Sequence, residues 1–291
     1  MSVQSPSSAA VLRGRLFAYL QYILPQHAIS RLVLKATRVR APWFKNALIR
    51  GFLRLFDVDM QDAVETDPLK FPSFNEFFTR ALKPGTRPLA PDANAIACPV
   101  DGAVSECGAI EGESLLQAKG QRYTLTELLA GQPWARRFEG GSFATIYLAP
   151  FNYHRIHMPL QGRLEETWYV PGRLFSVNTL TARFVPRLFA RNERIVTLFE
   201  TPAGAFALVM VGALNVGSMA TVWAGDIAPA ARRVVTRLPP AAVTLDKGAE
   251  LGRFNMGSTV ILLFEPARAQ WRTGLQAGLA VRLGETLGLV T

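Results

Sequence analysis

The first 56 positions of this 291-residue chain contain no acidic residue, although they hold nine lysines and arginines. The remaining positions are close to neutral, so most of the net charge of +10 comes from this N-terminal segment. A nucleic-acid groove needs a large basic face on the body of the protein, and none is expected here. The sequence therefore predicts no nucleic-acid partner.

Cysteine and histidine are also scarce. The two cysteines, Cys98 and Cys107, match no redox or zinc-binding spacing, which favours reduced thiols in a cytosolic compartment. Only three histidines are present, and no third His or Cys stands at ligand spacing from the two that lie together. We therefore expect no metal.

No uncharged run predicts a transmembrane span, because residues 16–30 are interrupted by Gln21, Pro25, Gln26 and His27. A secretory signal is also not favoured, since no small-residue cleavage site follows the early apolar run.

The N-terminal segment does contain basic amphipathic patterns. Residues 42–56 predict a helix that begins at Pro42, with an aromatic and aliphatic face flanked by Lys45, Arg50 and Arg54. Residues 11–24 have a similar pattern. Helices of this kind suit the interface of an anionic bilayer, although the pattern is also compatible with packing on the body of the protein. We expect the protein to be peripheral, at the cytoplasmic face of the cell membrane.

A short helix and a linker follow. Ser73 and Glu76 have the spacing of a capping box, which predicts a helix starting at Phe74. Residues 83–88 then form a Pro- and Gly-containing linker. We place a helical membrane-binding region at 1–70 and a β-rich catalytic domain at 71–291.

After residue 95 the pattern changes to short strands. Helical turns are expected only near 125–129 and 180–188, and the turn at 201–204 predicts a hairpin. The fold class is therefore α+β, a mainly antiparallel β-barrel or sandwich with a group of N-terminal amphipathic helices. The expected strands are 143–148, 194–200, 205–211, 219–223 and 259–264.

Three features carry possible chemistry. His154 and His157 form a clustered pair, Asp101 lies on a turn after a strand, and Ser258 follows Gly257 just before a strand. Together they supply the residue types of an Asp-His-Ser arrangement. The Ser258 hydroxyl could also attack the Gly257 carbonyl and replace an amide by a labile ester. Gly257-Ser258-Thr259 and Asp101-Gly102 alone are also ordinary turns, and a lone histidine more often makes structural hydrogen bonds.

A set of motifs is spread over residues 70–265: Phe74-Asn-Glu-Phe-Phe-Thr-Arg80, Pro99-Val-Asp-Gly102, Tyr153-His-Arg-Ile-His-Met-Pro159, Pro171-Gly-Arg-Leu-Phe-Ser-Val-Asn178, Phe189-Ala-Arg-Asn-Glu-Arg194 and Gly257-Ser-Thr259. Taken together, these motifs resemble phosphatidylserine decarboxylases of the bacterial membrane-associated type. Met256 departs from the leucine common in the family, an apolar change of similar volume.

The resemblance implies a self-cleaving proenzyme. Asp101 would orient His157, and His157 would act as a base on Ser258. The chain would break between Gly257 and Ser258, giving a β chain, 1–257, and an α chain, 258–291. A covalent pyruvoyl group derived from Ser258 would stand at the start of the α chain.

The resemblance further implies a carboxy-lyase that converts phosphatidylserine to phosphatidylethanolamine and CO₂ through a Schiff base on the pyruvoyl group. His154 would donate the proton at decarboxylation. Ser176 and Asn178 would hold the headgroup phosphate, unless they serve only a structural turn. The implied partners are phosphatidylserine, an anionic membrane surface and the two chains of one precursor, with a homo-oligomer left open.

Two other functions are compatible with the residues alone. A serine hydrolase could use Asp101, His157 and Ser258 on external esters, although Ser258 lacks the Gly-x-Ser-x-Gly elbow. A non-enzymatic membrane-binding β-module would need only the basic helices.

Overall fold

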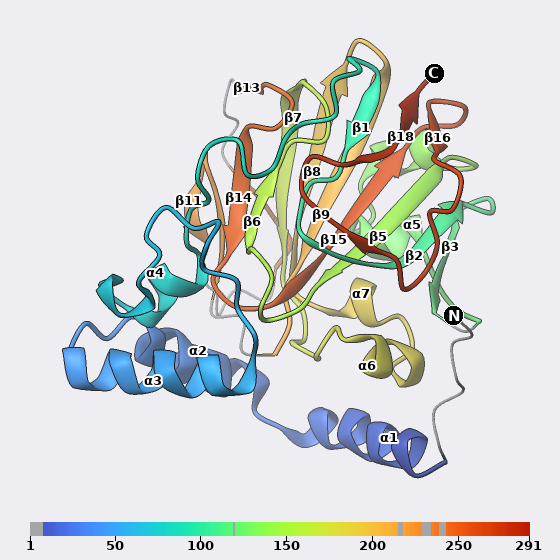
Figure 1. Ribbon diagram of the computed structural model, residues 1–291. Helices are drawn as coiled ribbons and strands as arrows, with labels where there is room; N and C mark the ends of the chain where they lie inside the picture. The colour runs from blue at the N-terminus through green and yellow to red at the C-terminus, as the bar shows by residue number, and fades with distance from the viewer. Residues whose placement is uncertain (1–7, 119, 215–217, 228–233, 239–242) are drawn as a thin grey trace.

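A long antiparallel sheet carries the body of the protein (Figure 1). The computed structural model describes residues 8–118, 120–214, 218–227, 234–238 and 243–291. The strands of this sheet, in spatial order, are β12 (Thr236–Arg237), β7 (Gly162–Val170), β8 (Arg194–Thr201), β9 (Gly204–Val211), β15 (Ser258–Phe264), β5 (Ser142–Leu148), β2 (Gly102–Ala109) and β17 (Ala280–Val281), with β13 (Thr244–Leu245) also paired to β7.

Three smaller antiparallel sheets surround the long one. The described strands leave β12 and β17 at opposite edges of the long sheet, so it does not close on itself. The α+β class and the antiparallel strands are confirmed, whereas the barrel alternative is wrong. The smaller sheets are β11 (Gly225–Ile227), β10 (Met219–Thr221), β14 (Glu250–Phe254) and β6 (Arg155–His157); β1 (Ala95–Ala97), β18 (Thr286–Val290) and β16 (Ala269–Trp271); and β3 (Ser114–Ala118) with β4 (Gln121–Thr124).

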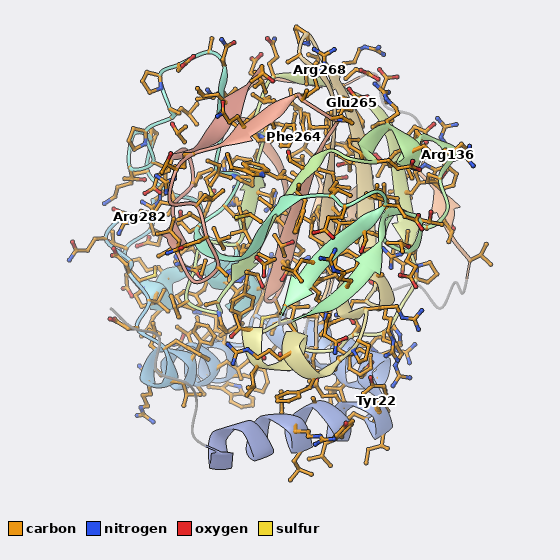
Figure 2. The ribbon with its side chains drawn as sticks, turned by 90° about the vertical axis from the view of Figure 1, so that its right-hand side faces the viewer. Tyr22, Arg136, Phe264, Glu265, Arg268 and Arg282 are labelled. Atoms are coloured by element: carbon orange, nitrogen blue, oxygen red, sulfur yellow. The ribbon has the colours of Figure 1, made fainter. Side chains whose placement is uncertain are left out.

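The core of the long sheet centres on β15. All of its side chains are buried, which explains why its sequence is a continuous apolar run rather than an alternating one. Phe206 on β9 lies between Phe199 and Phe264, with ring centroids 5.1 and 5.9 Å away. Figure 2 shows Phe264, the last residue of β15, at the end of the molecule opposite α1 and Tyr22. The strand therefore runs away from the helices.

The longer helices lie together on one side of the sheets (Figure 1). They are α1 (Ser8–Ile23), α2 (Gln26–Thr37) and α3 (Pro42–Leu55), followed by η1 (Pro68–Lys70) and α4 (Phe74–Phe78). Helix α3 begins at Pro42, as predicted. The division of the chain at residue 70 stays a prediction. The remaining helices are α5 (Leu125–Leu128), η2 (Pro133–Phe138), α6 (Thr179–Phe184) and α7 (Leu188–Arg191).

Helices α3 and α4 share a small aromatic core. Ile49, Phe74, Phe77 and Phe78 are buried together. The ring of Phe52 contacts the three phenylalanines of α4 at centroid distances of 5.3 to 6.0 Å. The short helix α4 is therefore held by tertiary packing rather than by its own length.

Two local predictions in this region need correction. The Ser73 hydroxyl does accept from the Glu76 amide at 3.2 Å, but the Glu76 carboxylate pairs with Arg40 at 3.2 Å, so only half of the expected capping box is made. Lys45, expected on a basic flank that suits a bilayer surface, is buried instead, and its ammonium donates to the Leu69 carbonyl at 2.7 Å. That carbonyl lies on η1, which the sequence pattern did not predict.

Helix α1 buries small residues and a glutamine and exposes large apolar side chains. Gly14, Ala18 and Gln21 face inward, whereas Leu16 and Ile23 on the opposite side are 59% and 79% exposed. Helices on globular proteins normally bury their large apolar side chains. Packing on the body therefore does not account for the apolar face of α1. Among the described helices, none is both long and apolar enough to cross a bilayer.

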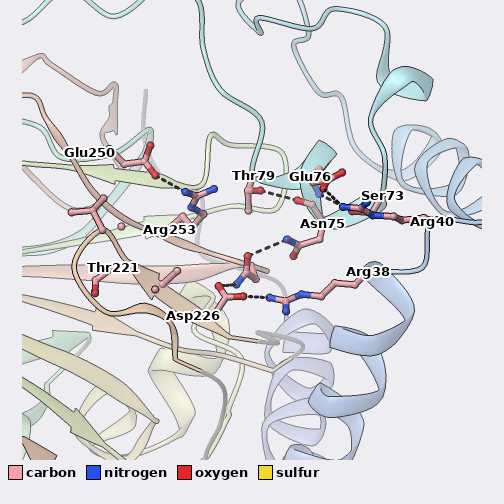
Figure 3. Close-up of a pocket in the computed structure, with 15 residues that line it drawn as sticks. Arg38, Arg40, Ser73, Asn75, Glu76, Thr79, Thr221, Asp226, Glu250 and Arg253 are labelled. Atoms are coloured by element: carbon pink, nitrogen blue, oxygen red, sulfur yellow. Dashed lines mark hydrogen bonds and ion pairs between the residues drawn. The ribbon is translucent and has the colours of Figure 1, made fainter. Parts of the chain in front are cut away.

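Polar contacts join the helices to the body around a cavity of about 640 Å³ (Figure 3). Arg38, just after α2, pairs with Asp226 on β11 at 2.5 Å. The Asn75 side-chain amide on α4 donates to the Asn255 side-chain oxygen Oδ1 at 3.2 Å. Asn255 lies two positions before Gly257, so the helices contact the segment that leads into β15.

Replacing Phe77 by alanine should lower the free energy of unfolding by about 3–5 kcal/mol, because a buried ring is removed and a cavity remains. Urea unfolding of the Ser258→Ala chain, which is expected to stay in one piece, measures this change. Trp43→Ala is the control, since Trp43 on α3 is 77% exposed and should change stability by no more than about 0.5 kcal/mol. Equal losses at both positions would contradict the packing described above.

Candidate functional site

Ser258 is the first residue of β15, and its position is fixed by the ladder with β5, where it pairs with Leu148. Its side chain is fully buried, and its hydroxyl oxygen has no hydrogen-bond partner among the residues that the structure describes. Gly257, just before it, lies outside the ladder and has open space where a side chain would stand. A cavity of about 240 Å³ borders both residues.

Ser176 and Asn178 line the same cavity as Ser258. Asn178 is also the N-cap of α6, where its side-chain oxygen accepts from the Thr181 amide at 2.8 Å. The cap is the structural role that the sequence analysis left open for Asn178. It uses only the side-chain oxygen and not the amino group. Phosphate binding by either residue stays a prediction.

His157 is the last residue of β6, and both of its ring nitrogens have partners. Nδ1 lies 2.8 Å from the Gly248 carbonyl, and Nε2 lies 3.0 Å from the Tyr153 hydroxyl. Because a carbonyl can only accept, we assign the hydrogen to Nδ1, which leaves Nε2 as an acceptor for the Tyr153 hydroxyl. Burial lowers the pKa of His157. The ring is therefore a neutral base with its lone pair on Nε2.

His154 lies in the turn before β6 and is fully buried. Nδ1 lies 2.8 Å from the Asn152 carbonyl and must donate to it, while Nε2 is buried and has no partner in the described part of the chain. The Phe78 ring lies 4.1 Å away, and burial lowers the pKa of His154 to about 3. His154 is thus a neutral acceptor in this structure. To act as the predicted proton donor, it must first take up the proton that it gives.

Asp101 lies in the bend between β1 and β2, and Arg87 holds its carboxylate. Arg87 donates from Nε and Nη2 at 3.0 and 2.7 Å, and the Leu283 amide donates at 2.9 Å. The hydrogen bond to Asp101 raises the pKa of Arg87. In the described part of the chain, no hydrogen bond joins Asp101 to His157. The orienting contact expected from the resemblance is thus absent from this arrangement and stays a prediction.

Sequence reasoning missed Arg87, which it assigned only to a linker. The one available signal was an arginine within that otherwise Pro- and Gly-rich segment. Its partners, Asp101 and Asp62, come from different segments, and only the fold brings them together.

The sheet brings Asp101 and Ser258 to the same end of the neighbouring strands β2, β5 and β15. Ala103 at the start of β2 pairs with Tyr147 near the end of β5, and Tyr147 pairs with Thr259 at the start of β15. Asp101 lies two residues before Ala103, and Ser258 lies one residue before Thr259. Asp101 and Tyr153 line a second cavity, of about 230 Å³.

The described residues contain no group of three or more His, Cys, Asp and Glu side chains that could hold a metal ion. Cys98 and Cys107 are free, and burial raises the pKa of both thiols.

Comparison with known proteins identifies the family. Residues 74–289 match the family model described as phosphatidylserine decarboxylase. The chain belongs to the phosphatidylserine decarboxylase family. A second family model, described as PSD, matches residues 16–57, which include most of α1 and all of α2 and α3. The resemblance seen in the sequence motifs is confirmed.

Curated relatives align with this family member over nearly its full length. Phosphatidylserine decarboxylase proenzyme of Methylococcus capsulatus is 51% identical over 96% of this chain and 98% of its own length. The proenzymes of Bordetella bronchiseptica and Pseudomonas aeruginosa are each 53% identical over 95% of this chain, and over 95% and 98% of their own lengths. These matches support neither the serine hydrolase nor the non-enzymatic alternative.

Stability should fall on acidification because of His154. Its folded-state pKa of about 3 lies below the ordinary value near 6.5, so the unfolded chain binds the proton first as the pH falls. The contribution of neutral His154 is fully present above about pH 6.5. Between pH 7 and pH 5, protonation of His154 in the unfolded chain should lower the free energy of unfolding by about 2 kcal/mol. Urea unfolding of the Ser258→Ala chain at the two pH values measures the loss.

In the same background, His154→Gln cannot take up this proton and should lose less stability between pH 7 and pH 5. An identical pH dependence with and without His154 would rule out the burial of a neutral imidazole.

Proposed function

We propose that this protein is a phosphatidylserine decarboxylase made as a self-cleaving proenzyme, which converts phosphatidylserine to phosphatidylethanolamine and CO₂. The observation that supports this most directly is the place of the Ser258 hydroxyl, which is buried without a partner among the described residues, next to Gly257 and at a cavity that both residues line. A buried hydroxyl normally finds a hydrogen-bond partner. Other buried hydroxyls, such as that of Ser142, also lack one, but Ser258 combines this with the neighbouring Gly257 carbonyl and the cavity, and family membership agrees with its proposed reaction.

Cleavage would begin with attack of the Ser258 hydroxyl oxygen on the Gly257 carbonyl carbon. The hydroxyl proton leaves, the amide nitrogen gains a proton, and the C–N bond breaks to give an ester. Loss of the α-proton of residue 258 then breaks its Cβ–O bond, which releases the Gly257 carboxylate and leaves dehydroalanine. This tautomerises to an imine, and water hydrolyses the imine to a ketone and ammonia. The products are a β chain, 1–257, and an α chain, 258–291, that begins with a pyruvoyl ketone.

The surroundings of Ser258 fit this group. The ladder to Leu148 holds the residue in place, the open space at Gly257 gives the peptide room, and the cavity gives a substrate access. The ketone supplies an electron sink for the electron pair that remains when CO₂ leaves. The cavity walls, including Ser176 and Asn178, would hold the phospholipid headgroup.

His157 would accept the Ser258 proton during cleavage. Its neutral ring and its lone pair on Nε2 suit a base, but this lone pair faces the Tyr153 hydroxyl. That contact must be exchanged before His157 can act. Asp101 would orient the His157 ring. In this structure Arg87 donates to the Asp101 carboxylate.

His154 would handle the proton of the second reaction. With Nδ1 held by the Asn152 carbonyl, Nε2 is the only ring atom free to take a proton and return it. A buried imidazole with a low pKa gives up that proton readily.

The exposed apolar face of α1 and the basic N-terminal segment would hold the protein peripherally on an anionic membrane, at the cytoplasmic face. Leu16, Leu20 and Ile23 are exposed beside Arg15, which combines apolar area with positive charge.

Intact-mass measurement tests the cleavage. The purified wild-type protein should consist of two chains that separate on denaturation, whereas Ser258→Ala should remain one chain of about 31.9 kDa. Ser142→Ala is a matched control, because Ser142 also has a buried, unpartnered hydroxyl but lies at the other end of the β5–β15 ladder. A wild-type protein that decarboxylates phosphatidylserine as one intact chain would refute the proposal.

The two histidines should separate the two reactions. His157→Ala should slow cleavage by roughly 10²-fold or more, since the base is lost. His154→Ala should cleave normally and then lose decarboxylase activity by a similar factor. Mass spectrometry follows the first reaction and release of CO₂ the second. If His154→Ala fails to cleave, the assignment of the two roles is incorrect.

A further inference from the structure

Helix α1 and the start of α2 hold the loop that precedes α6. The Gln21 side-chain oxygen accepts from the Ser176 amide at 2.6 Å, and the Gln26 side-chain oxygen accepts from the Leu174 amide at 2.9 Å. His27 Nε2 lies 2.9 Å from the Gly172 carbonyl. Side chains from the N-terminal helices thus satisfy alternate backbone groups of residues 172–176.

Gln21 is the contact closest to the candidate site. It is fully buried, and its amino group also donates to the Phe17 carbonyl at 3.3 Å. Phe17, Ser176 and Ser258 line the same cavity. One side chain therefore connects the two walls that face Ser258, one from α1 and one from the loop.

The opposite face of α1 supplies the second observation. Leu16, Leu20 and Ile23 are exposed on the helix that buries Gln21, with the cation of Arg15 beside them. An apolar face bordered by positive charge suits the surface of an anionic phospholipid bilayer. Phe17 lies between this face and the cavity, so the two are continuous.

We propose that α1 couples the lipid surface to the substrate cavity, and that Gln21 is the positioning residue that carries the coupling. The helix rests on the bilayer through its apolar face, and Gln21 holds Ser176 and its neighbours in the arrangement that receives the headgroup. This inference rests on the proposed function, because it assumes that the cavity beside Ser258 binds phospholipid.

A pair of substitutions of similar size tests the role of Gln21. Gln21→Met removes the acceptor for the Ser176 amide, whereas Gln21→Glu retains one. With phosphatidylserine in mixed micelles, we expect Gln21→Met to raise KM about tenfold, to leave kcat within about twofold and to cleave normally by intact mass. Gln21→Glu should recover most of the loss in KM. A wild-type KM in Gln21→Met, a failure to cleave, or an equal loss in Gln21→Glu would each overturn the coupling.

Hydrogen exchange provides a readout that needs no activity. In the uncleaved Ser258→Ala chain, Gln21→Met should accelerate exchange in the peptide covering residues 172–178 by about tenfold, and Gln21→Glu should not. Vesicles of phosphatidylcholine with phosphatidylglycerol should slow exchange in this peptide when Gln21 is present and not in Gln21→Met. Unchanged exchange in Gln21→Met, or vesicle protection that does not need Gln21, would overturn the coupling, whereas an uncleaved wild type would refute the proposed function itself.

Discussion

The ladder that holds β15 between β5 and β9 is the constraint on which the candidate site depends. It fixes Ser258 at one end of a fully buried strand and leaves Gly257 outside the hydrogen-bonded register. A reactive peptide needs both properties, since the nucleophile must be held while the neighbouring carbonyl can distort. The same register brings the start of β2, and with it Asp101, to the end of the sheet where β15 begins.

The N-terminal helices contribute side chains to the candidate site. Phe78 packs on His154, Phe17 borders the Ser258 cavity, and Gln21 holds Ser176. The orientation of α1 makes this possible, because Gln21 faces the loop while Leu16 and Ile23 face outward. In the proposed coupling, α1 would connect the lipid surface to the cavity that receives the headgroup.

The sequence was sufficient for features set by local pattern. The apolar run of β15, the hairpin turn at 201–204 and the start of α3 at Pro42 were all predicted correctly. Features that depend on distant partners were not predicted. Periodicity identifies α1 as a helix but does not determine which face is buried, and the partners of Arg87 and Gln21 lie up to 155 residues away. The spacing of Ser73 and Glu76 suggested a full capping box because nothing local reveals the competition from Arg40.

The strand pairing of the C-terminal segment has a consequence for how a cleaved protein would hold together. Residues after 257 pair with strands from before the break at several places: β15 with β5 and β9, β17 with β2, and β18 with β1. After the proposed break between Gly257 and Ser258, the same fold would be a heterodimer held without a covalent link, and its unfolding would be a dissociation that depends on concentration. Refolding would then need two chains to meet, so the cleaved protein would depend on a slow rate of unfolding to persist.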